Sequence, residues 1–323
     1  MPCVDRHSRM PDDLTCGELA RLALGDRYQS VRWAVARLPL PSDLEAVHDT
    51  RVALRRLREA LLGLAPCLTK KDLRLGDRVR LAERELGPLR DSEVRDELLA
   101  KVLGPVAVSW DRSDDPMVAA AYGKSLVPFG SELRSGPRGF ESEARRCLAD
   151  RLAAETAVAR DRLVEGRGLR RLARLEPPSA GRLGMASQRP ALELACHQLP
   201  KLFRSAARPH KSRVQLHARR IRVRRLRYRL ELFAPALGEG QAAVIEQLRQ
   251  VQSLLGRFHD LAMLVEWMDS ASRSQPRELR PALRRLTARV ELEHQAAEEE
   301  ADALLRRLDL AEWWVAARHA AST

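Results

Sequence analysis

The sequence has few aromatic residues and no long apolar run. Aromatic side chains make up 4% of the 323 residues, whereas apolar residues make up 45% and charged residues 31%. No stretch approaches the roughly 18 consecutive apolar residues of a membrane span, and the polar segment Met1–Cys16 contains no hydrophobic signal core. We therefore predict no membrane contact and a cytoplasmic location.

Cysteines and β-branched residues are also scarce. The five cysteines are widely spaced and include no C-x-x-C pair, so they predict neither a disulfide scaffold nor a zinc site. Leu, Ala, Arg and Glu dominate instead, a composition typical of helices. We expect an all-α protein with reduced cysteines and without a metal or cofactor.

The chain carries an excess of positive charge. It has 57 Lys and Arg against 44 Asp and Glu, a formal net charge of +13. A polyanionic partner would explain this excess, but so would a GC-rich genome that raises the arginine content throughout. The placement of the arginines must therefore decide between the two explanations.

An internal repeat shows how the arginines are placed. Residues 47–58 (VHDTRVALRRLR) and 216–227 (LHARRIRVRRLR) both read H-x-x-R-[VI]-x-x-R-R-L-R. With these copies aligned at a constant offset, residues 86–91 (LGPLRD) match residues 255–260 (LGRFHD) without any shift. Two motifs that share one offset predict a duplicated domain.

A stretch rich in Gly and Pro, residues 176–190, separates the two copies. The domain organisation that we predict is an N-terminal tail (1–13), a first helical bundle (14–175), a linker (176–190), a second helical bundle (191–318) and a C-terminal tail (319–323).

Each repeated segment predicts an amphipathic helix. Ser42 and Glu45 have capping-box spacing and mark the expected start of the first one. At 100° per residue, one face carries leucines and the opposite face carries cations about 15 Å along the axis, enough for several phosphates. The cationic positions are His48, Arg51, Arg55 and Arg58 in the first copy and His217, Arg220, Arg224 and Arg227 in the second.

Such a cationic face favours an anionic ligand. Like charges on successive turns repel, so an anion that neutralises them stabilises the helix. The planar guanidinium makes bidentate, charge-assisted hydrogen bonds to phosphate. The second motif is interpreted as structural, with Gly87 and Gly256 allowing close helix contact and Asp91 and Asp260 pairing with nearby arginines.

In combination, these motifs and Tyr228 with the following Glu231-Leu-Phe233 resemble the CHAD family, the conserved histidine α-helical domain, from about Leu14 to Arg318. The resemblance implies two pseudo-twofold-related four-helix bundles with a basic central groove or pore that binds inorganic polyphosphate. Its role there, whether storage, recruitment to polyphosphate granules or regulation, is left open, as are the oligomeric state and a bridging metal.

Carried over by position, the implied polyphosphate-binding residues are the eight cationic positions given above. Arg32 and Lys201, which align at the same offset and each lie on the preceding helix, are added to them. The segment 104–139 is not readily matched to the family. Arg219 and Arg222 have no cationic counterparts in the first copy, so we expect the second half to bind more strongly.

Two other functions are weighed. Non-specific nucleic-acid binding would also use arginines, but aromatic residues for base stacking are not interleaved with them. A helical metal-dependent phosphohydrolase is suggested by the dipeptides His48-Asp49 and His259-Asp260, yet the repeat aligns Asp49 with Ala218 and His259 with Arg90. No complete catalytic motif is present, and we predict a non-catalytic protein.

Overall fold

The computed structural model describes residues 14–39, 43, 45–104, 137–174, 183, 185–208, 213–238 and 241–307. Within these ranges every regular element is a helix, apart from one isolated bridge between Thr15 and Pro190. The prediction of an all-α protein is confirmed. Among the described helices, none is long and apolar enough to cross a bilayer.

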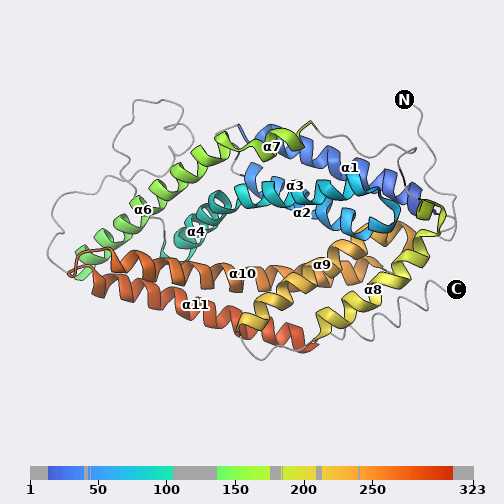
Figure 1. Cartoon of the computed structure of the whole chain (residues 1–323). Coiled ribbons are helices and arrows are strands. Elements are labelled where there is room, and N and C mark those ends of the chain that lie inside the picture. The colour runs from blue at the N-terminus through green and yellow to red at the C-terminus, as the bar shows by residue number, and fades with distance from the viewer. Residues whose placement is uncertain are drawn as a thin grey trace.

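The helices form an elongated arrangement in which the two halves of the chain lie side by side (Figure 1). The first half contains α1 (Cys16–Arg37), α2 (Ala46–Gly63), the 3₁₀ helix η2 (Ala65–Cys67), α3 (Lys70–Glu85), α4 (Gly87–Leu103), α6 (Pro137–Glu165) and α7 (Arg167–Leu172). The second half contains the 3₁₀ helix η4 (Met185–Gln188), α8 (Ala191–Ala207), α9 (Arg213–Leu237), α10 (Gln241–Arg273) and α11 (Arg280–Arg307).

Helix starts follow local capping chemistry in some places and tertiary contacts in others. Thr15 caps α1 in a capping box with Glu18, which supplies partners for two backbone N–H groups. The predicted start of α2 at Ser42 is wrong, because α2 begins at Ala46 and Glu45 makes no side-chain cap. Asp43 is instead held by Arg37 of α1, whose Nε lies 2.6 Å from its carboxylate.

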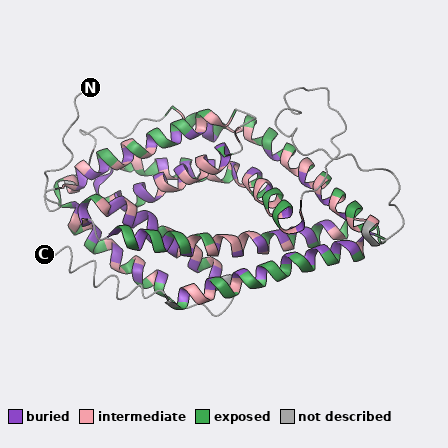
Figure 2. Ribbon diagram, turned by 180° about the vertical axis from the view of Figure 1, so that it is seen from behind, coloured by how far each residue is buried: buried purple, intermediate pink, exposed green. Residues whose placement is uncertain are grey.

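The packing order of the first half recurs in the second. α1 packs on α2 and α2 on α3, while α8 packs on α9 and α9 on α10. The apolar residues of both halves join in one core, which extends from Leu19 to Leu305. Buried residues lie on the helix faces turned toward neighbouring helices, and exposed residues cover the outer faces (Figure 2). The halves are therefore joined by a shared hydrophobic core.

The two halves touch most closely where α2 crosses α9. A Cβ atom added at Gly63 would lie 2.6 Å from the side chain of Leu232, so a larger residue there would displace that leucine. Nearby, Arg56 of α2 reaches Glu231 of α9, and Arg225 of α9 reaches Glu59 of α2, each at 3.6 Å. These contacts fix α2 and α9 relative to each other and thereby position their cationic faces.

Parts of the predicted organisation lie outside the described residues. They are both tails, residues 308–318 at the end of the predicted second bundle, residues 176–182 and 184 of the linker, and residues 105–136 of the unmatched segment. The end of the linker is described and packs on the first half, where the backbone N–H of Cys16 donates to the carbonyl of Arg189 at 2.7 Å. The end of the linker is thus held beside the start of α1 before α8 begins.

Candidate functional site

Helix α2 separates its leucines from its cations as the sequence predicts. Leu54, Leu57 and Leu61 are each at most 2% exposed and belong to the core. The four cationic positions of the first copy, His48, Arg51, Arg55 and Arg58, are half-buried. The burial of the leucine face therefore fixes the direction in which the cations point.

Helix α9 has the same two-sided character. Leu226, Leu230 and Phe233 are at most 1% exposed. On the opposite side His217, Arg220 and Arg224 are half-buried, whereas Arg227 is only 6% exposed. The two cationic faces thus resemble each other except at their last position.

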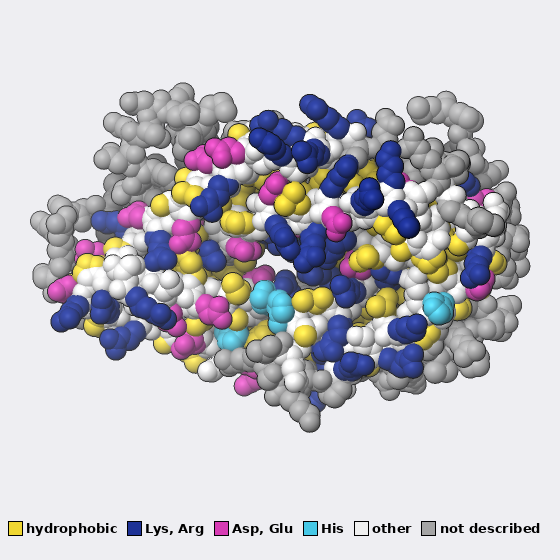
Figure 3. Space-filling view, viewed as in Figure 1, with side chains coloured by type: hydrophobic (Ala, Val, Ile, Leu, Met, Phe, Trp, Pro, Cys, Tyr) yellow, Lys and Arg dark blue, Asp and Glu magenta, His cyan; other side chains and the backbone are white. Residues whose placement is uncertain are grey.

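A central cavity of about 170 Å³ lies between the two halves. Lysine and arginine side chains gather around a hollow in the middle of this face of the molecule, with histidines beside them (Figure 3). The basic residues of the cavity wall are His48, Arg51 and Arg55 of α2, Arg90 and Arg95 of α4, Arg220 of α9 and His259 of α10. Four of the ten predicted binding residues therefore line one cavity.

The sequence analysis did not identify the remaining basic residues of the cavity wall as binding residues. Arg90 and His259 belong to the second repeated motif, which was interpreted as structural, yet both line the cavity wall. They align with each other in the repeat, so the shared offset could have identified them. Gly256, assigned to close helix packing, has no atom within 4 Å of a Cβ added there, so that part of the interpretation is wrong.

The motif aspartates also lie in the wall of the central cavity. Asp260 forms an ion pair with Arg220 at 3.8 Å, which confirms the predicted pairing in the second half. Burial raises the pKa of Asp260, and Arg220 opposes that shift. Asp91, at the equivalent position of α4, lines the cavity and favours the charged form of Arg51.

Two arginines carry buried charge that nearby carboxylates do not balance. Burial, and then the proximity of Arg55, lowers the pKa of Arg51 to about 10, and the same two causes lower the pKa of Arg224 to about 10. One buried guanidinium nitrogen of Arg51, Nη1, has no hydrogen-bond partner among the described residues. Because both groups are still protonated at neutral pH, an incoming anion would relieve this unfavourable charge.

Arg58 and Arg227 are already bound to acceptors within the protein. Nη1 of Arg58 lies 2.5 Å from Glu83 of α3, and Nη1 of Arg227 lies 2.7 Å from Glu231. Nε of Arg227 also donates to Gln252 of α10 at 2.8 Å. Neither arginine lines the central cavity, so within the protein they connect α2 to α3 and α9 to α10.

The two residues added from the preceding helices lie elsewhere. Arg32 on α1 and Lys201 on α8 are exposed and are not part of the cavity wall. Arg219, the basis for expecting stronger binding by the second half, is only 6% exposed, and Asp302 of α11 acts on its charge. The structure therefore does not bring Arg32, Lys201 or Arg219 into the cavity.

The histidines of the site are held in an environment that disfavours their charged form. Nδ1 of His217 lies 3.2 Å from Nδ1 of His259, with ring centroids 4.4 Å apart. Burial, followed by the charge of Arg220, lowers the pKa of both, that of His259 to about 4. Burial and the charge of Arg90 similarly lower the pKa of His48. Bound anions would reverse this tendency.

The His-Asp dipeptides do not place their four side chains together. His48, His259 and Asp260 line the cavity, whereas Asp49 is bound to Arg37 at 2.5 Å and contributes to a different cavity. Within the described ranges, no group of three or more His, Cys, Asp or Glu side chains is arranged to hold a metal ion.

The sequence matches the model of one protein family. The model of the CHAD domain matches residues 27–269, three quarters of the chain. The chain belongs to the CHAD family. The match starts within α1 and ends within α10, so it covers both repeated motifs and the whole wall of the central cavity.

Solved CHAD structures share the fold. A crystal structure of the CHAD domain from the plant Ricinus communis is 20% identical, with a TM-score of 0.61 over 96% of this chain and 98% of that one. PptA from Streptomyces chartreusis is 16% identical, with a TM-score of 0.62 over 90% of this chain and 99% of that one. No curated protein matches the sequence. At these identities the structural likeness concerns the CHAD fold.

Proposed function

We propose that this CHAD protein binds inorganic polyphosphate in the central cavity and along the α2 and α9 faces that border it. The observation that carries the proposal is that Arg51 and Arg55 from one half line the cavity together with Arg220 from the other, without enough carboxylates to balance them. Arg224 lies outside the wall, within electrostatic reach of Arg55 and Arg220. Each charge-assisted hydrogen bond from such a residue contributes on the order of 1.5–3 kcal/mol.

The make-up of the wall favours polyphosphate over nucleic acid. Arg90 and Arg95 are partly neutralised by Glu93 and Glu155, at 3.3 and 3.4 Å, whereas no ion pair is found for Arg51 or Arg55 among the described residues. The described cavity wall contains no Phe, Tyr or Trp side chain on which a base could stack. A bare chain of phosphates uses all of the charge in the cavity and requires no stacking surface.

Calorimetric titration tests the proposal. Long-chain polyphosphate, orthophosphate and single-stranded DNA of matched charge are titrated at the same ionic strength, because salt strongly affects all such affinities. Polyphosphate is expected to bind at least about tenfold more tightly than the DNA, and orthophosphate much more weakly. Equal affinity for the DNA and polyphosphate, or no polyphosphate binding, contradicts the proposal.

We also propose that the bound polymer is not turned over. The carboxylates of the cavity wall, Asp91 and Asp260, lie among arginines, and Asp260 is paired with Arg220. Incubation with polyphosphate and Mg²⁺, with or without ADP, is expected to leave the chain length unchanged on a gel. Release of orthophosphate or formation of ATP that disappears in Asp260→Asn would contradict this part of the proposal.

A further inference from the structure

A second and larger cavity, of about 580 Å³, lies between α1 and α2. On α1 its wall includes Asp26, Arg27, Gln29, Ser30 and Trp33, and on α2 it includes Asp49 and Arg56. Most of the α1 positions are three or four residues apart and so share a helix face. The volume falls in the range of about 300–1,000 Å³ that small-molecule sites occupy. The two cavities share no lining residue.

Two arginine nitrogens of this α1–α2 cavity are buried without a hydrogen-bond acceptor in the described part of the chain. Nε of Arg27 and Nε of Arg56 are buried and have no hydrogen-bond partner among the described residues. Burial lowers the pKa of Arg27, while the charges of Glu231 and Asp26 oppose that shift. Glu231 lies 3.6 Å from Arg56, but it already accepts a hydrogen bond from Arg227 at 2.7 Å. Of the two wall carboxylates, Asp49 is bound by Arg37 at 2.5 Å and Asp26 is exposed to solvent. The buried nitrogens of Arg27 and Arg56 are therefore available to an anion.

The same cavity contains an aromatic surface that is held in place. Trp33 is 61% exposed, an unusual exposure for the largest side chain. The guanidinium of Arg37 covers one side of its ring at 4.1 Å from the centroid. Arg37 is in turn fixed by Asp43 and Asp49, at 2.6 and 2.5 Å. The indole is thus a supported platform that can stack with a planar group.

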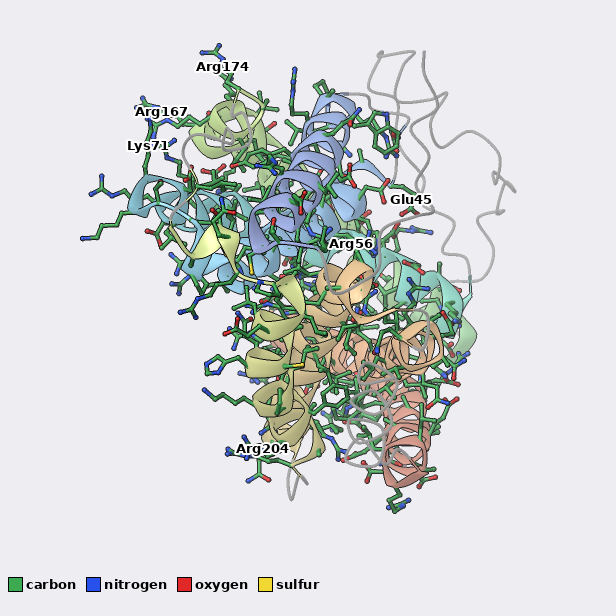
Figure 4. The ribbon with its side chains drawn as sticks, turned by 90° about the vertical axis from the view of Figure 1, so that its right-hand side faces the viewer. Glu45, Arg56, Lys71, Arg167, Arg174 and Arg204 are labelled. Carbon is green, nitrogen blue, oxygen red and sulfur yellow. The ribbon has the colours of Figure 1, made fainter. Side chains whose placement is uncertain are left out.

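We propose that the α1–α2 cavity binds a mononucleotide, with its base stacked on Trp33 and its phosphate bound by Arg27 and Arg56. Six residues of helix separate Arg27 from Trp33, about 9 Å along the axis, which suits a ligand with its planar and anionic ends apart. Gln29 and Ser30 are exposed in the wall between them, where the sugar hydroxyls of the ligand would lie. Figure 4 shows Arg56 near the place where α1 and α9 meet, whereas Arg204 of α8 lies at the far end of that helix.

The test uses AMP as the probe and the full chain. Binding is followed by calorimetry with AMP, adenosine and orthophosphate for the wild-type protein, Trp33→Ala, Trp33→Phe and Arg27→Gln. AMP is expected to bind saturably, and Trp33→Ala to weaken it about tenfold or more through lost stacking, with partial recovery in Trp33→Phe. Because Trp33 is exposed, these variants keep the core intact. Arg27→Gln is expected to bring the affinity for AMP close to that for adenosine.

A variant of the proposed polyphosphate site distinguishes the α1–α2 cavity from the central cavity. Arg224→Glu is expected to leave AMP affinity within about twofold of wild type, while Trp33→Ala leaves the affinity for long-chain polyphosphate unchanged, since the sites use different residues. Loss of AMP binding in Arg224→Glu but not in Trp33→Ala would assign the nucleotide to the central cavity and overturn the proposal. So would the absence of saturable AMP binding to the wild-type protein. Failure of the polyphosphate proposal alone leaves these expectations unchanged.

Discussion

The two halves of the molecule hold equivalent arginines in different ways. Arg58 in the first half is bound by the carboxylate of Glu83, whereas Arg227 in the second half is bound by the amide of Gln252. Glu83 and Gln252 align with each other in the repeat, as the two arginines do. The acceptor position is therefore retained while its charge differs, and in the second half Arg227 receives its carboxylate from Glu231 of α9 itself, at 2.7 Å.

The backbone also differs without disturbing the cavity. Pro88 follows the break between α3 and α4, and lacks the N–H that a continuous helix would use. Arg257 stands at the equivalent position of α10, which continues unbroken for 33 residues. Arg90 and His259, two residues further on, nevertheless both line the central cavity. The wall is therefore formed with a helix break in one half and with a continuous helix in the other.

Reversing the charge of one arginine in each half should have the largest effect, and it tests whether both halves contribute to polyphosphate affinity. Arg55→Glu and Arg224→Glu should each weaken polyphosphate binding about tenfold to a hundredfold, because each removes a charge-assisted hydrogen bond, and the double variant by at least about a hundredfold. Calorimetry measures the affinities, and circular dichroism checks folding. Arg204→Glu, the same charge change on the exposed side of α8, serves as the control. A loss confined to one variant would show that the ligand contacts a single half.

Exchanging the residue types of the two acceptors, Glu83 and Gln252, should change polyphosphate affinity by a smaller factor. Glu83 lies within electrostatic reach of Arg55, Arg224 and Arg51. Glu83→Gln keeps an acceptor for Arg58 and removes a negative charge, so polyphosphate affinity should rise about fivefold, as expected for one charge acting over roughly 10 Å. Gln252→Glu should lower it by a similar factor. Equal affinities in titrations of the two variants and the wild-type protein would place the polymer away from both positions.

The smallest expected effect is the pH dependence of polyphosphate affinity, and the pKa of His259 sets its direction. His259 has a pKa of about 4 in the free protein, below its ordinary value near 6.5, so the stability that it contributes is lost as pH falls from about 6.5 toward 4. A bound polyanion raises that pKa, so binding takes up protons and affinity should rise about threefold between pH 7.5 and 5.5. Calorimetry in buffers of different ionisation enthalpy measures the uptake. His259→Gln should reduce it, and an unchanged uptake would exclude this histidine.

The sequence predicts those parts of the site that depend on one helix at a time. The faces of α2 and α9 follow from the helical period alone, because Leu54 and Leu226 must point into a core. Arg90, Arg95 and His259 depend on how α4 and α10 approach that face, which no local pattern encodes. The binding of Arg58 by Glu83 likewise needs the packing of α2 on α3. The start of α2 at Ala46 differs from the Ser42–Glu45 prediction, and the bond of Asp43 to Arg37 of α1 is likewise a tertiary contact that local spacing does not encode.

The contact between Gly63 and Leu232 has a consequence for symmetry. The two residues occupy the same position of the repeat, one in each copy, and they touch each other. Two identical subunits would have to place the same residue on both sides of this contact, either two leucines that collide or two glycines that leave a gap. A single polypeptide can place a small residue against a large one. Joining both halves in one chain thus permits a tighter junction than a homodimer of either half could form.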